Sequence, residues 1–422
     1  MSIKAAIKRN KSGMFRRVYM KRRLEDDYES SWQRIPQKYL LKFGMLNNSI
    51  DDIKINFLKN SGFNLTVNNE DGYFADTSDV KSFFYNSWSI VRTLVKVEAG
   101  YDYNSTEYPT DSTMFIGLIG EDYRYTENSN VQYNMKHISS VFDEMPADEL
   151  SGMNVSLTAS EVVTKIRDFE DANSVAVFQK YITSGGWTIE STTQYYLFAT
   201  NSTLQNMSCW ALLRKLAEAE NMVAYVDRVG DFHFESKAAN TTAAIYHLSG
   251  VKDRDKTYGH NIIGGIVVDD NIRKVYNRVM IKYDEDETTT SYKIKKEDYN
   301  WFDSESSFIY GVRTYKYENT FMGAAIASAT AIRIYDEYRW PKEEVQVKTK
   351  YLPQLNINDR ISMTYKSQKV EGEYLWGHFN WNEGVWGQRK GYNINIDNQD
   401  YRLTGIIHNL NDFTSKLTLR EI

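Results

Sequence analysis

The chain has 422 residues, which is too long for a single hydrophobic core and predicts two or three domains. Its formal net charge of −5 argues against a general nucleic-acid-binding protein, since such proteins usually carry a basic excess. The single cysteine, Cys209, excludes an intrachain disulfide and a cysteine-rich metal site, and we expect it to be a small buried apolar residue.

The composition favours packed β-structure and offers no signal for a metal or a membrane. Hydrophobic residues make up 41% of the chain and aromatic residues 14%, with 31 Tyr. The histidines contain no i, i+4 pair of the kind that binds zinc. No apolar run is long enough to span a bilayer, and the basic N-terminus lacks the apolar segment of a secretory signal. We therefore expect no metal, no cofactor and no stable membrane insertion.

Residues 1–23 form a basic N-terminal arm that carries nine Lys or Arg and no acid. Such an arm can contact an acidic partner or nucleic acid, although most runs of this kind are solvated tails or edge segments. We expect the arm to become ordered against a neighbouring subunit.

Residues 24–150 are predicted to form the first β-domain. Apolar and polar side chains alternate over residues 53–57 and 63–67, and residues 90–97, 114–119 and 131–142 are further strand candidates. A polar turn at residues 68–72 ends on Gly72. Short strands at this spacing predict a small antiparallel barrel or sandwich that ends near Pro146.

Residues 151–250 are predicted to form a compact α+β insert. The pattern predicts a helix over residues 157–182, stopped by Gly185 and Gly186, and a strand over residues 187–198.

A second helix in this insert begins after Ser208, a suitable N-cap, and ends near Asn221. Trp210, Leu213 and Leu216 recur on one face of it, as in an amphipathic helix. Two short apolar runs, 222–226 and 232–234, then flank a polar loop and predict a hairpin. The pattern alone favours an ordinary core unit over a ligand site.

Residues 251–422 are predicted to form a second small barrel with an attached helix and an aromatic hairpin. Strands are expected at residues 266–268, 275–281, 291–294, 345–347, 361–363, 401–407 and 416–419. A helix is predicted over residues 321–338, and Trp340 and Pro341 end it. No sequence repeat relates this domain to the first.

No sequence motif for catalysis occurs: there is no nucleophile elbow, phosphate-binding loop, zinc-protease motif or dinucleotide-binding glycine motif. Adjacent acids such as Asp26 and Asp27 are expected in turns, where carboxylates are solvated far more often than catalytic. We expect a non-enzymatic protein with no catalytic residue.

The most unusual local composition lies at residues 374–387. Trp376, Phe379, Trp381 and Trp386 stand there among Gly, Asn and Glu383. Exposed aromatic rings beside amides and acids can stack on sugar rings or form interface contacts. The alternative is a hairpin whose rings pack on their own barrel.

The helix and hairpin of the insert carry a resemblance to a known family. A Ser or Thr, then x-W-x-x-L-x-x-L-A-x-A, then D-x-x-G-x-x-x-F resembles the hub proteins of bacteriophage baseplates and tail tips. In this chain the pattern is carried by Ser208, Trp210, Leu213, Leu216, Asp227, Gly230 and Phe234. Residues 275–279 and 352–361 look similar to the same family, the latter with Pro353 and Asp359 entering a barrel strand.

The resemblance implies a β-rich α+β fold: two small tail-tube-like antiparallel β-barrels joined by an α+β insert domain. It also implies a structural virion protein of the tail tip or baseplate, made in the host cytoplasm. Three copies would form a ring that adapts a sixfold tail tube to a threefold spike and lines the DNA channel. The implied partners are two further copies, a tail tube or distal tail protein, a spike, fibre or central tip protein, and the tape measure protein. DNA would be passing cargo only.

Two alternatives remain open at this stage. The aromatic hairpin and nearby acids would also suit a carbohydrate-binding protein or glycoside hydrolase of the tail tip. A hexameric distal tail or tube adaptor protein would share the β-rich fold but differ in stoichiometry.

Overall fold

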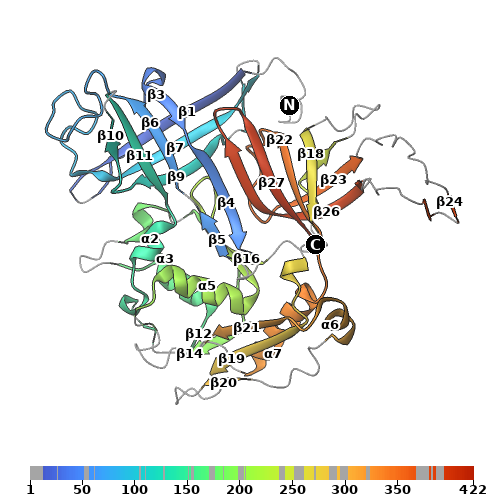
Figure 1. Ribbon diagram of the computed structural model, residues 1–422. Helices are drawn as coiled ribbons and strands as arrows, with labels where there is room; N and C mark the ends of the chain where they lie inside the picture. Colours follow the sequence, from blue (N-terminus) through green and yellow to red (C-terminus); the bar gives the residue numbers. More distant parts are fainter. Residues whose placement is uncertain are drawn as a thin grey trace.

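The computed structural model describes residues 13–25, 27–51, 57–60, 62–103, 106–109, 111–126, 129–150, 152–153, 156–170, 176–183, 185–197, 204, 206–236, 243–250, 261–269, 272–284, 292–294, 303–319, 324–366, 380–381, 384–385 and 394–422. Two large sheets lie side by side at the top of Figure 1, and a layer that contains the helices lies below them.

The first sheet is antiparallel and runs in the order β2-β1-β7-β9-β11-β6-β3, with β8 and β10 at its margins. It encloses a core of apolar side chains that includes Val18, Phe63, Val97 and Tyr133. Its elements are β1 (Gly13–Arg23), β2 (Gln33–Arg34), η1 (Gln37–Tyr39), β3 (Leu40–Phe43), β6 (Phe63–Asn68), β7 (Ser89–Tyr103), β8 (Thr106–Tyr108), β9 (Thr113–Ile119), β10 (Arg124–Tyr125) and β11 (Asn130–His137).

Residues 13–23 of the expected basic arm form β1, so the prediction of a separate arm is wrong for this part. β1 pairs with β7 along its length, from Gly13 opposite Asp102 to Arg23 opposite Ser89. Val18 and Met20 are fully buried, and Arg17, Tyr19 and Lys21 occupy the positions that alternate with them. The basic side chains of this core strand are partly buried, while residues 1–12 lie outside the described part of the chain.

The second sheet runs in the order β13-β16-β15-β5-β4-β26-β27-β22-β18, and β17 and β23 branch from β26. Its elements are β4 (Met45–Asp51), β5 (Phe57–Asn60), β13 (Trp187–Ile189), β15 (Met222–Val226), β16 (Phe232–Ser236), β17 (Tyr246–Ser249), β18 (Ile262–Asp269), β22 (Glu344–Lys350), β23 (Arg360–Lys366), β26 (Asn395–Asn409) and β27 (Thr414–Glu421). Figure 1 shows β4, in blue, lying beside the red strands of the chain's end.

Two segments therefore cross the domain boundaries expected at residues 150 and 250. β4 comes from the expected first domain but pairs with β26, and β5 continues to β15. β17 comes from the expected insert but pairs in parallel with β23. Long-range strand pairing overrides sequence order here, because the alternation of a strand specifies its faces and not its neighbour.

The insert begins before the boundary expected at residue 151, since Ile138, Val141 and Phe142 already belong to the apolar core that it helps to form. Its elements outside the second sheet are α2 (Ser140–Glu144), η2 (Ala147–Glu149), β12 (Ser156–Thr158), α3 (Ala159–Arg167), η3 (Phe178–Lys180), β14 (Tyr195–Leu197) and α5 (Cys209–Glu220). α5 packs on β15 and contacts α2 and α3. Cys209 is buried and free, as the sequence predicts.

The single long helix predicted over residues 157–182 is wrong. α3 begins at a capping box of Thr158 and Glu161 and ends at Asp168. The chain then reverses direction, since Glu170 forms an antiparallel bridge with Ala176. Polar residues that favour turns follow Phe169 and outweigh the apolar spacing farther on. Residues 140–142, predicted as part of a strand, belong instead to α2.

The helix after Ser208 and its hairpin are confirmed. The Ser208 side chain accepts a hydrogen bond from the Ala211 amide, and Asn221 ends the helix in the left-handed conformation with φ of 61°. β15 and β16 then pair antiparallel from Met222 opposite Ser236 to Val226 opposite Phe232.

The remaining elements form a small sheet and two helices beside the insert. They are η4 (Ile272–Lys274), β19 (Arg278–Asp284), β20 (Tyr292–Ile294), α6 (Ser304–Tyr310), β21 (Thr314–Asn319) and α7 (Ala324–Tyr338), with the short pair β24 (Asn380–Trp381) and β25 (Gly384–Val385) farther along. α7 packs on β19 and also contacts α5. The predicted β-rich α+β class with antiparallel sheets is confirmed. No helix among the described residues is long and apolar enough to cross a membrane.

Candidate functional site

The apolar residues of the family motif form the core of the insert. Leu213, Leu216 and Phe234 have no exposed surface, and Trp210 is 5% exposed. The Trp210 ring stacks on Phe142 of α2, with ring centroids 5.6 Å apart. These side chains pack α5 against the hairpin.

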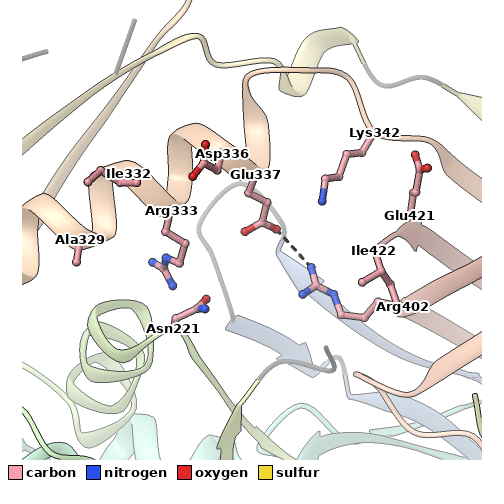
Figure 2. A pocket seen from close by; sticks show the side chains of 10 residues that line it. All are labelled: Asn221, Ala329, Ile332, Arg333, Asp336, Glu337, Lys342, Arg402, Glu421 and Ile422. Atoms are coloured by element: carbon pink, nitrogen blue, oxygen red, sulfur yellow. Dashed lines mark ion pairs between the residues drawn. The ribbon is translucent and has the colours of Figure 1, made fainter. Parts of the chain in front are cut away.

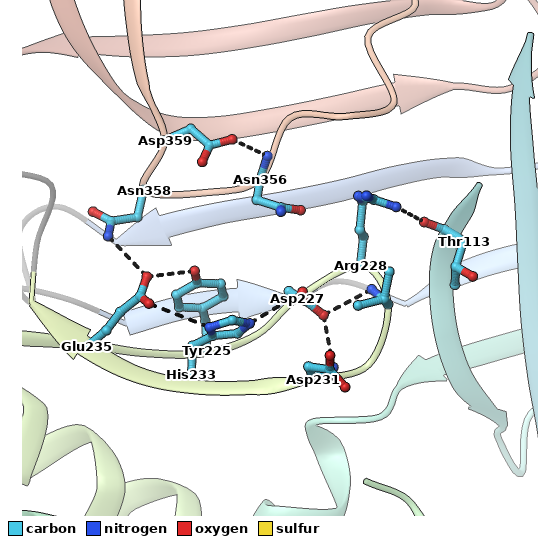
Figure 3. A network of polar contacts seen from close by, with 11 residues as sticks. Thr113, Tyr225, Asp227, Arg228, Asp231, His233, Glu235, Asn356, Asn358 and Asp359 are labelled. Atoms are coloured by element: carbon cyan, nitrogen blue, oxygen red, sulfur yellow. Dashed lines mark hydrogen bonds and ion pairs between the residues drawn. The ribbon is translucent and has the colours of Figure 1, made fainter. Parts of the chain in front are cut away.

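The polar residues of the motif shape the tip of the hairpin (Figure 3). Asp227 Oδ1 accepts hydrogen bonds from the amides of Val229, at 3.0 Å, and Asp231, at 2.9 Å. Gly230 has φ of 91°, and a Cβ there would lie 3.0 Å from Ile116 Cδ1 of the first sheet. The Asp and Gly of the motif therefore close the loop and let its tip lie against β9.

Arg228 extends from the same loop and joins the hairpin to the first sheet. Its Nη1 donates to the carbonyl oxygens of Asp111, at 3.0 Å, and Thr113, at 2.6 Å. A guanidinium group that donates to two carbonyl oxygens at the end of a strand holds its own loop in place against that strand.

The second sheet meets the other side of the hairpin through the loop before β23. Asn358, with φ of 72°, donates from Nδ2 to Glu235 Oε1 at 3.5 Å and to the Ser236 carbonyl at 3.3 Å. Asp359 Oδ2 accepts from the Asn356 amide at 2.6 Å, which closes that loop. The hairpin belongs to the second sheet, bonds through its tip to the first sheet, and bonds through β16 to the loop before β23. We call its polar residues and those of that loop the junction network: Asp227, Arg228, His233, Glu235, Asn356, Asn358 and Asp359.

His233 lies at the centre of the junction network. Its Nε2 is 3.3 Å from Asp227 Oδ2, its Nδ1 is 3.5 Å from Glu235 Oε2, and its ring stacks on Tyr225 with centroids 4.8 Å apart. Burial acts to lower the pKa of His233, but the hydrogen bond to Asp227 and the nearby carboxylate of Glu235 outweigh burial and raise the pKa to about 9. His233 is therefore cationic at neutral pH, between two carboxylates.

The environment of Asp359 disfavours the charged form of its side chain, whereas that of His233 favours the charged form. Burial raises the pKa of Asp359 to about 7, against the hydrogen bond from the Asn356 amide, and the nearby Glu235 carboxylate raises it further. Pro353, the other motif residue of this loop, is buried. Asp359 thus closes the loop that leads into β23, and the structural role of both residues stays a prediction.

The junction network holds the parts of the protein together and has little space for a substrate. The cavity beside Asp227 and Asn356 measures about 10 Å³, roughly the space of one water molecule. Within the described residues, no group of three or more His, Cys, Asp or Glu could hold a metal ion.

The charge on His233 predicts a loss of stability with rising pH. Because the pKa is raised from 6.5 to about 9, its stabilising contribution is complete below pH 6.5 and is lost as the pH rises through 9. We expect the free energy of unfolding to fall by about 2 kcal/mol over this interval, after allowance for solvent screening. Urea unfolding at pH 6 and pH 9.5 measures it.

His233→Gln should remove most of the difference in the free energy of unfolding between pH 6 and pH 9.5. His247→Gln replaces a partly buried histidine of β17 and should retain this difference. An equal pH dependence in wild type and His233→Gln would contradict the assignment of the positive charge.

The aromatic hairpin lies mostly outside the described residues. This holds for Trp376, Phe379, Glu383 and Trp386. Trp381 belongs to β24, where its backbone pairs with Gly384 of β25. The proposed glycan or interface contact of these residues stays a prediction.

Sequence reasoning missed the junction residues Arg228, His233, Glu235 and Asn358. One signal was present, because His233 and Glu235 alternate with the buried Phe232 and Phe234 and so had to share the other face of β16. Nothing local indicated that this face would meet a loop more than a hundred residues away.

No family model matches the sequence, and no curated protein matches it. The fold, however, is similar along almost the whole chain to two solved structures. One is the tail protein from Neisseria meningitidis MC58, with 8% identity, a TM-score of 0.52, and coverage of 97% of this chain and 96% of that chain. The other is the prophage MuSo2 43 kDa tail protein from Shewanella oneidensis, with 11% identity, a TM-score of 0.50, and coverage of 96% and 97%.

The likeness includes both sheets and the insert between them, so it concerns the complete architecture rather than one common β-domain. The chain has the fold of phage tail proteins, which confirms, at the level of the fold, the resemblance to tail hubs that its helix and hairpin carry.

Proposed function

We propose that the chain is a structural tail hub at the distal end of a phage or phage-like tail. The observation that carries this proposal is the end-to-end agreement of its fold with two tail proteins at 96% to 97% coverage of each chain. In this proposal three copies form a ring that adapts a sixfold tail tube to a threefold spike or fibre and surrounds the DNA channel.

The surface supports an assembled state. Phe308 of α6 is 91% exposed, and Ile309 and Val312 beside it are 55% and 60% exposed. Large apolar side chains that gather on a surface mark sites of protein association more often than free surface. The net charge of −5 also suits a channel wall that must not retain DNA.

The proposed partners follow from this position in the tail. A tail tube or distal tail protein would contact one face of the ring, and a spike, fibre or central tip protein the other. The tape measure protein and DNA would pass through the centre. The protein would have a structural and not an enzymatic role, located in the virion at the tail tip or baseplate.

Electron microscopy of the purified protein and of intact particles tests the proposal. We expect a ring with threefold symmetry and six β-units around a channel, and native mass spectrometry should give three times the 49.2 kDa of one chain. A ring of six copies would instead favour the hexameric adaptor. A protein that is monomeric in solution and absent from purified particles would overturn the proposal.

A further inference from the structure

A polar hollow of about 520 Å³ lies where α7 meets the end of α5 and the last strands of the second sheet. Figure 2 shows side chains from all these elements around it, with Lys342 reaching in from the segment after α7. Its charged lining residues are Arg333, Asp336, Glu337, Lys342, Arg402 and Glu421. Its size is in the range of sites for small ligands.

Two guanidinium groups in this hollow have buried N–H donors without a partner. Arg333 Nη2 donates to the Glu218 carbonyl at 3.1 Å, but Arg333 Nη1 is buried and bonds to nothing within the described residues. Arg402 Nε is likewise buried and has no hydrogen-bond partner within the described residues. Buried donors of charged groups are nearly always satisfied, so two in one hollow indicate a missing acceptor.

Lys342 adds a third cation. Burial lowers its pKa, and the positive charges of Arg420 and Arg402 act in the same direction, against Glu337. Its ammonium group has no ion-pair partner in the described part of the chain. The carboxylates of Glu337 and Glu421 offset the charges of Lys342, Arg402 and Arg420 in part, and an added anion would offset them further.

The acids of the hollow already have partners, and Glu337 pairs with Arg402 inside it (Figure 2). Glu337 is shared between Arg402, at 3.6 Å, and Arg420, at 3.7 Å. Asp336 is 59% exposed and lies 3.9 Å from Arg339. Glu421 accepts from Gln399 Nε2 at 3.0 Å and from the Glu343 amide at 3.3 Å.

Asn221 completes the lining beside Arg333, toward which it points in Figure 2. Its Oδ1 is buried without a partner. A half-turn of the amide would place an N–H there instead, so this side chain can add a donor to those of the cations.

We propose that this hollow is an oxyanion-binding site, in which Arg333, Lys342 and Arg402 hold a carboxylate of a partner polypeptide or a free phosphate ion. Both ligands present oxygens that accept charge-assisted hydrogen bonds from guanidinium and ammonium groups. Because the hollow joins α7 to the second sheet, a bound anion also ties these two parts together. The site would bind anions whether or not the chain assembles in a tail.

Isothermal titration calorimetry with the full chain at constant ionic strength tests the site. One probe is inorganic phosphate, and the other is a hexaglutamate peptide blocked at both ends. Lys342→Met keeps most of the side-chain stem and should weaken binding about tenfold. Lys348→Met removes an exposed cation of β22 and should leave binding unchanged.

The two probes separate the sources of the anion. Binding of phosphate alone would assign the site to a free ion, and tighter binding of the peptide would assign it to a partner's carboxylates. Arg333→Gln is a second variant, and it should weaken the binding of the same probe. The proposal is overturned if neither probe binds the wild type at millimolar concentration, if Lys342→Met binds as tightly as wild type, or if Lys348→Met loses binding equally.

Discussion

Replacing Trp210 by Ala is expected to destabilise the insert by about 3 to 5 kcal/mol, the usual cost of removing a large buried aromatic side chain. Trp210 is 5% exposed, and its ring stacks on Phe142 between α5 and α2. Its loss would leave a cavity against the fully buried Leu213 and weaken the platform on which the hairpin rests. Urea unfolding followed by circular dichroism, with hydrogen exchange at the α5 amides, measures the effect.

Trp88 offers a matched control because it is the same residue type but 61% exposed. Trp88→Ala should change the free energy of unfolding by no more than about 0.5 kcal/mol. Equal effects of the two substitutions would show that the Trp210 ring is not part of a packed core.

Replacing Asp359 by Asn is expected to stabilise the protein at and above neutral pH. The folded protein raises the pKa of this carboxyl from 3.8 to about 7, so the native state holds its proton more tightly than the unfolded chain. Stability therefore falls as the pH rises from 3.8 to 7, by about 4 kcal/mol for a fully buried group. Solvent reaches the partly buried Asp359, so about 2 kcal/mol is a realistic gain for the variant.

The amide oxygen of Asn can still accept the 2.6 Å hydrogen bond from the Asn356 amide, so the loop should keep its shape. Urea unfolding at pH 4 and pH 8 should show the gain only at pH 8. Asp397→Asn replaces an exposed carboxyl group of β26 and serves as the control. It should show no gain in the free energy of unfolding at either pH. A variant that is less stable than wild type at pH 8 would mean that the Asp359 carboxylate is a favourable charge in the junction network.

Local structure was predictable where a short segment contains both the periodic pattern of its apolar residues and the residues that begin and end the element. Ser208, the apolar face of α5 and Asn221 specify the helix from cap to cap. The alternating segment at residues 63–67 is likewise found in β6. In both cases the determining contacts lie within a few residues of each other.

Prediction failed where a distant partner decides the structure. The basic residues at 13–23 suggested a free arm, but pairing with β7 and the burial of Val18 and Met20 make the segment a core strand. The helix predicted over residues 157–182 failed for a local reason instead: it ends at Asp168 because polar turn residues outweigh a periodic pattern that continues beyond them.

The sequence by itself determined the α+β composition, the helix and hairpin of the insert, and the faces of many strands, because caps, turns and side-chain periodicity act over short distances. Only the tertiary structure decided that β4 joins β26, that Arg228 connects the hairpin to the first sheet, and that Asn358 connects it to the loop before β23. The same holds for the hollow around Lys342. These features depend on which surfaces meet after folding, and strand patterns carry little information about the identity of a partner far along the chain.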